Sequence, residues 1–103
     1  EQDPSELRRA KRDLVSFSTQ ATGRSGTHSI HVVNISPLGL MARTDIAFLA
    51  GDSLRIDLPH LRAVEAIVRW VEDGRIGTEF TRGIDTQNYD AMLAFMPERQ
   101  KAW

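Results

Sequence analysis

The sequence predicts a small all-β domain that ends in one α-helix. Short segments with alternating apolar and polar residues are separated by turns containing glycine, proline or aspartate, which is typical of antiparallel hairpins. Near the C-terminus the apolar spacing changes to three and four residues, which indicates a helix. The chain of 103 residues, 41% of them hydrophobic, suffices for one domain with its own core. Six strands and a terminal helix predict a small antiparallel barrel or sandwich.

The six predicted strands are, in chain order, residues 14–20, 27–35, 40–44, 54–58, 62–72 and 75–80. In the first strand we expect Val15 and Phe17 on the buried side. The fourth strand has the clearest alternation of apolar and polar residues. Asp73-Gly74 predicts a type I′ turn between the last two strands, because both central residues of that turn need a positive φ.

The terminal helix is predicted over about residues 85–96. Asp85 is a favourable N-cap, Ile84 and Tyr89 have the spacing of a hydrophobic staple, and Pro97 is expected to end the helix. The apolar residues of this segment share one helical stripe, which we expect to pack over the mouth or edge of the sheet: Tyr89, Met92, Leu93 and Met96.

Composition and spacing argue against catalysis. The chain has no cysteine, which excludes disulfides and thiolate chemistry. His28 and His31 point to opposite faces of a predicted strand, so we expect no metal site and no cofactor. The serines lack a base at a recognisable spacing, and no glycine-rich loop precedes a helix. No apolar run approaches the roughly 18 residues of a membrane span. We therefore expect a cytoplasmic binding protein that is not an enzyme and has no membrane segment.

Residues 1–12 form a basic arm that contains Arg8-Arg9-Ala10-Lys11-Arg12. Guanidinium groups bind phosphate oxygens and the O6/N7 edge of guanine, and they stack on flat rings. The arm therefore indicates an anionic ligand that carries bases, although a basic run of this kind is also typical of a solvated leader. The net charge of −1 favours a small ligand over a nucleic-acid polymer.

The second predicted strand ends in Asn34-Ile35-Ser36-Pro37-Leu38-Gly39. In an extended chain Asn34 and Ser36 point to the same side, where both can donate and accept hydrogen bonds. Gly39 allows a turn or a close approach of the backbone to a ligand. By itself the segment could equally be an Asx-turn that stabilises the end of a strand.

The order of the two motifs along the chain matches that of a known protein family. Arg8-x-x-x-Arg12 precedes the first strand, and Asn34-x-Ser36-x-x-Gly39 follows the second, so the chain resembles the PilZ family of bacterial cyclic di-GMP receptors. The resemblance extends from about Leu7 through the closing hairpin to the terminal helix. It implies a stand-alone domain with a six-stranded antiparallel barrel over residues 13–96 and a tail at 97–103.

The resemblance also implies roles for the motif residues. Arg8 and Arg12 would bind guanine O6/N7 or phosphate and stack on a guanine ring, with Arg9 assisting. Asn34 would accept from a guanine N–H. Its amide replaces the aspartate of many family members and makes that hydrogen bond neutral, and therefore weaker. Ser36 would bond a base or a phosphate.

Gly39 would hold the geometry of the loop. Two further residues are possible ligand contacts. Trp70 could stack on a base, although a tryptophan on a strand is commonly part of the core. Arg43 could reach a phosphate, or it could be an ordinary surface arginine.

The family resemblance implies signalling by a second messenger. We expect the flexible arm to fold over the ligand and present a new surface to a protein partner that controls motility, exopolysaccharide synthesis or biofilm formation. One alternative is a ligand-independent PilZ-like adaptor, although such adaptors typically lack the arginine motif. Another is a barrel that binds oligonucleotides, against which the near-zero net charge and the seven aromatic residues argue.

Overall fold

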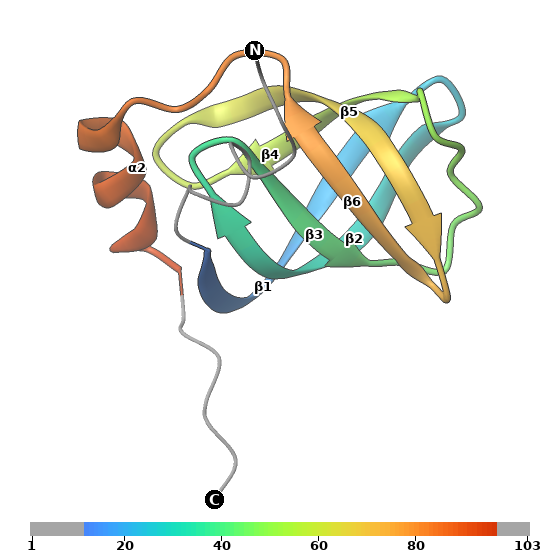
Figure 1. The fold of residues 1–103 in the computed structure, drawn as a ribbon, viewed down its shortest axis with the longest axis horizontal. Coiled ribbons are helices and arrows are strands. Elements are labelled where there is room, and N and C mark those ends of the chain that lie inside the picture. Colours follow the sequence, from blue (N-terminus) through green and yellow to red (C-terminus); the bar gives the residue numbers. More distant parts are fainter. Residues whose placement is uncertain (1–11, 97–103) are drawn as a thin grey trace, which may run out of the picture.

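The computed structural model describes residues 12–96, which form a closed barrel of six antiparallel strands with one helix (Figure 1). Around the barrel the strands follow the order β1-β2-β3-β6-β5-β4. Their bounds are β1 Asp13–Gly23, β2 Gly26–Ser36, β3 Gly39–Arg43, β4 Ser53–Leu58, β5 Arg62–Glu72 and β6 Arg75–Phe80. The six predicted strands are confirmed, and the architecture is a barrel and not a sandwich.

The core fills the inside of the barrel with side chains from all six strands. In β4 every second residue is buried, as the strict alternation predicts. Val15 is buried, and Phe17 is partly buried and packs against the core, so both lie on the predicted side of β1. The largest fully buried side chains are Val15, Val32, Ile35, Ile56, Val68, Ile76 and Met92.

The strand pairing has three register shifts, one of them in β1 between Leu14 and Phe17, and the other two are β-bulges that change which face of the barrel the later residues of a strand occupy. The register of β2 against β3 shifts between Val32 and Asn34, and that of β5 against β6 shifts between Val68 and Trp70. The extra residues are Val33 and Arg69. Because each bulge adds one residue to one strand only, the inward–outward alternation resumes one position out of phase. Residues that strict alternation would place inside therefore lie outside.

The Asp73-Gly74 turn has the predicted conformation. Asp73 has φ 51° and Gly74 has φ 75°, so both central residues are in the left-handed region that a type I′ turn requires. Thr44 N donates to Gly74 O over 2.9 Å, which attaches this turn to the end of β3. The β5–β6 hairpin is therefore held at its tip as well as along its ladder.

The helix α2, Thr86–Leu93, covers one end of the barrel and is shorter than predicted (Figure 1). It ends at Leu93, because the next two turns tighten to i→i−3 hydrogen bonds, from Phe95 N to Met92 O and from Met96 N to Leu93 O. Asp85 is the N-cap residue, but its carboxylate does not bond the helix backbone.

Instead, Asp85 Oδ1 accepts a hydrogen bond of 2.6 Å from Asn88 Nδ2. Two of the predicted stripe residues, Tyr89 and Met92, are buried against the barrel, and Met96 is buried beyond the end of the helix. Among residues 12–96 no helix has the length and apolar character needed to cross a membrane.

Candidate functional site

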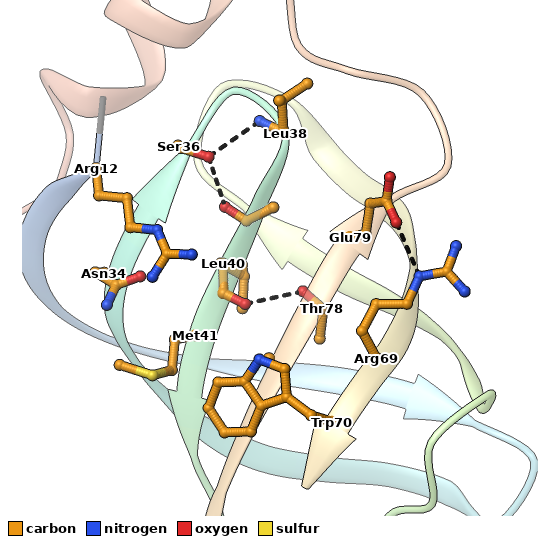
Figure 2. Close-up of a pocket in the computed structure, with 12 residues that line it drawn as sticks. Arg12, Asn34, Ser36, Leu38, Leu40, Met41, Arg69, Trp70, Thr78 and Glu79 are labelled. Carbon is orange, nitrogen blue, oxygen red and sulfur yellow. Dashed lines mark hydrogen bonds and ion pairs between the residues drawn. The ribbon is translucent and has the colours of Figure 1, made fainter. Parts of the chain in front are cut away.

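Two cross-strand rows on the outer face of the barrel surround a hollow of about 130 Å³ (Figure 2). From β2 to β5 the first row contains Asn34, Met41, Gly77 and Trp70. From β2 to β6 the second row contains Ser36, Gly39 and Glu79. Arg12, which directly precedes β1, also lines the hollow. The Asn-x-Ser-x-x-Gly motif therefore lies in the same depression as Trp70, although 34 and 70 are far apart in the chain.

The hollow exists because two central positions of these rows are glycines. At Gly77 a β-carbon would collide with the indole of Trp70. At Gly39 a β-carbon would collide with the backbone carbonyl of Thr78 on β6. Neither glycine has a positive φ, so what requires glycine here is close approach and not an unusual backbone conformation.

Asn34 points to the outer face because of the β2 bulge at Val33. Without the extra residue it would have the same orientation as Val32, whose side chain is in the core. Asn34 is 8% exposed, and its side-chain amide forms no hydrogen bond to the described residues. In Figure 2 the Arg12 side chain extends toward it. A nearly buried amide without a described partner can donate to a ligand and accept from it.

Ser36 stabilises the loop between β2 and β3. Its hydroxyl accepts a hydrogen bond from Leu38 N over 3.2 Å and donates to Gly39 O over 3.5 Å (Figure 2). The loop is also fixed to its neighbours by bonds from Phe80 N to Leu38 O and from Ile84 N to Pro37 O, each 2.8 Å long. The hydroxyl keeps one free lone pair. The loop is thus stabilised by the Ser36 hydroxyl and not by the Asx-turn considered from the sequence, because the Asn34 side chain forms no hydrogen bond to the described residues.

Trp70 lies on the outer face and not in the core. Ala66 and Val68 point inward, and strict alternation would place Trp70 beside them, but the bulge at Arg69 reverses its orientation. The indole covers Gly77, its partner on β6, and the residue stays 40% exposed. An exposed aromatic ring at the edge of a hollow is suited to stacking on a flat ligand ring.

An ion pair at the rim of the hollow was missed by the sequence analysis. Arg69 Nε donates to Glu79 Oε1 over 2.8 Å (Figure 2). In a regular hairpin that closes at the Asp73-Gly74 turn, Arg69 and Glu79 would not be neighbours. Only the bulge at Arg69 turns its side chain toward Glu79, and nothing in the alternation of β5 predicts that bulge.

The family comparison agrees with this geometry. The family model for the PilZ domain matches residues 6–96. The chain belongs to the PilZ family. PilZ domains are binding and adaptor domains and not enzymes, and cyclic di-GMP binding is the usual role of the family. A comparison with curated proteins returned no match.

The arginines that the sequence analysis selected in this PilZ domain have different locations. Arg12 lines the hollow. Arg8 and Arg9 lie outside the described residues. Arg43 does not line the hollow; it is on β3, where its register partners are His31 on β2 and Arg75 on β6, and it borders a separate depression on the barrel surface.

Tyr89 connects the helix of the PilZ domain to the start of β1 and to the end of β2. Its hydroxyl donates to Asp13 Oδ2 over 2.6 Å and to the backbone oxygen of Ile35 over 3.0 Å. Asp13 follows Arg12, and Ile35 lies between Asn34 and Ser36. Burial raises the pKa of the Tyr89 hydroxyl above its ordinary value, and the hydrogen bond and negative charge of Asp13 raise it further. This phenol is therefore a proton donor throughout the physiological pH range.

Metal binding has no support within the described part of the chain. In residues 12–96 no three histidine or acidic side chains are grouped closely enough to hold a metal ion. The side chains that line the hollow offer hydrogen bonding, charge and aromatic stacking.

Proposed function

We propose that this PilZ domain is a receptor for cyclic di-GMP. The observation that carries the proposal is the convergence of Asn34, Ser36, Arg12 and Trp70 on one hollow. Cyclic di-GMP contains two phosphates and two guanines, so its binding needs cations, base-edge hydrogen bonds and flat surfaces. The hollow supplies each of these groups on the outer face of a closed barrel.

The proposed roles follow from the chemistry of each side chain. Arg12, together with Arg8 and Arg9 of the arm, binds phosphate or guanine O6/N7 and stacks on a base. Asn34 accepts from a guanine N–H, and Ser36 uses its remaining lone pair or a rotated hydroxyl. Trp70 stacks on a base. No metal or organic cofactor is needed for binding of this kind.

The size of the hollow suggests how the arm participates. A volume of about 130 Å³ is below the roughly 300–1,000 Å³ of pockets that enclose small molecules, so only part of a cyclic dinucleotide would enter it. The rest would lie on the barrel surface, where arginines from the arm can cover it. Closure of the arm would change the surface available to a protein partner, which is how a binding domain without catalytic groups can transmit a signal.

Isothermal titration with cyclic di-GMP tests the receptor function. We expect saturable binding by the parent and no measurable binding of GTP at the same concentrations. The double variant Arg8→Ala/Arg12→Ala should weaken binding about 100-fold or more, because it removes two charge-assisted contacts. The matched control is Arg24→Ala/Arg55→Ala, which changes the net charge equally but alters two arginines that do not line the hollow. Absence of binding to the folded parent would overturn the proposal and leave the ligand-independent adaptor.

A further inference from the structure

We propose that Arg69 and Glu79 form a base-reading pair that selects guanine over adenine at the β5–β6 rim of the hollow. The proposal rests on the cyclic di-GMP receptor function and adds the residues that decide which base the site accepts. An amide carries both a donor and an acceptor, so asparagine can pair with adenine as well as with guanine. A site that contains Asn34 therefore gains selectivity from a further group that reads the base edge, in addition to the arginines that contact phosphate or guanine O6/N7.

The Arg69–Glu79 pair is positioned to be that group. Glu79 belongs to the second row of the outer face, next to Gly39, whose missing side chain leaves the carboxylate open to the hollow. Arg69 is the extra residue of the β5 bulge and precedes Trp70. Both charged residues line the hollow, on the side opposite Asn34 (Figure 2). A base stacked on Trp70 would present its edge to them.

The pair leaves hydrogen-bonding groups available. Its bond joins Arg69 Nε to Glu79 Oε1, so the two terminal guanidinium nitrogens and Oε2 have no partner among the described residues. The side chains are 56% and 37% exposed, which means that both groups are already hydrated and can exchange water for a ligand at little cost. The existing bond holds the donors and the acceptor side by side before the ligand binds.

Guanine has the complementary edge. Its O6 accepts, and the adjacent N1–H and N2–H donate, so the Arg69 nitrogens can donate to O6 while Glu79 Oε2 accepts from N1–H or N2–H. Adenine has the opposite order, with the N6 amine as donor and N1 as acceptor. A carboxylate can only accept, so with adenine it would face the lone pair of N1. Both contacts to guanine are charge-assisted, and a mismatched base would leave them unmade.

The test compares cyclic di-GMP with cyclic di-AMP in isothermal titrations of the parent and of Glu79→Gln. Glutamine keeps the size of the side chain but introduces an amide that can serve either base. We expect the affinity for cyclic di-GMP to fall about tenfold. The selectivity ratio, which is the Kd for cyclic di-AMP divided by the Kd for cyclic di-GMP, should fall by a similar factor. Arg69→Gln, which removes the O6 donor and keeps the carboxylate, should also lower the ratio.

The matched control is Glu65→Gln. Glu65 pairs with Arg55 across β4 and β5 at 3.9 Å, is exposed, and does not line the hollow. This variant should keep both affinities within twofold. If the parent binds cyclic di-GMP but Glu79→Gln and Arg69→Gln both leave the ratio unchanged, the base-reading role is wrong and the receptor function stands. If the folded parent binds no cyclic di-GMP, the receptor function itself is wrong and the base-reading role falls with it.

Discussion

The indole of Trp70 lies over Gly77, its cross-strand partner, and occupies the space that a β-carbon at Gly77 would need. This contact places an exposed aromatic ring beside the hollow and leaves the adjacent backbone open. It depends on two features of the hairpin, the bulge at Arg69 that turns Trp70 outward and the absence of a side chain on β6.

Gly77→Ala should displace the indole. The added methyl group meets a side chain that is 40% exposed and can swing into solvent, so the loss in free energy of unfolding should be small, about 1 kcal/mol or less. Ligand stacking on Trp70 should weaken, and the Trp70 fluorescence should shift to longer wavelength. The measurement needs a Trp103→Phe background, because the chain has two tryptophans. Unchanged emission in the alanine variant would contradict the contact.

Gly39→Ala should destabilise the barrel more strongly than Gly77→Ala. Its β-carbon meets the backbone of Thr78, and a backbone carbonyl in a ladder cannot move aside without weakening the β3–β6 pairing. We expect a loss of about 2–3 kcal/mol in the free energy of unfolding, measured by urea denaturation. Gly83→Ala is the control, since its β-carbon makes only van der Waals contacts. Equal stability of the two variants would refute the explanation.

Tyr89→Phe should change how stability depends on pH. Because the native pKa of Tyr89 is raised above the ordinary 10.0, the unfolded chain loses this proton first as the pH rises. The contribution is therefore fully present below about pH 10 and declines above it. Parent and variant should differ by about 1–2 kcal/mol at neutral pH, from the loss of the bond to Asp13, and the difference should shrink at alkaline pH.

Urea denaturation of both proteins from pH 7 to pH 11 measures this difference. Tyr89 is the single tyrosine of the chain, so the absorbance of tyrosinate reports on this hydroxyl alone. Ionisation of the folded parent near pH 10 would show that the phenol is not buried as described.

Asn34→Asp should strengthen cyclic di-GMP binding if the proposed function is correct. A carboxylate in place of the amide makes the bond to a guanine N–H charge-assisted and adds attraction to Arg12, which lines the same hollow. We expect affinity to rise by up to about tenfold in isothermal titration. Asn34→Ala serves as the opposite control and should weaken binding. A weaker complex with aspartate than with asparagine would argue against contact between this side chain and a base donor.

Much of the fold could be predicted from local pattern. The alternation in residues 54–58 predicted β4, the Asp73-Gly74 pair predicted a turn with two positive φ angles, and the apolar stripe around Tyr89 and Met92 predicted the helix. Each of these signals is local, because it depends on the conformational preference or periodicity of a few successive residues. The predicted end of the helix, near residue 96, lies beyond the observed end at Leu93, because the turns before Pro97 tighten.

The orientation of the site residues was decided by tertiary structure. A strand alternates its side chains with period two, and a single extra residue reverses every later position. The bulges at Val33 and Arg69 each add one residue to one strand of a pair, and the alternation of apolar and polar residues in β2 and β5 does not predict them. The sequence by itself determined which strands form, and it identified Asn34, Ser36 and Gly39 as a motif. Closure of the barrel decided that this motif, Trp70 and the Arg69–Glu79 pair share one outer face, because register between strands is a property of the whole sheet.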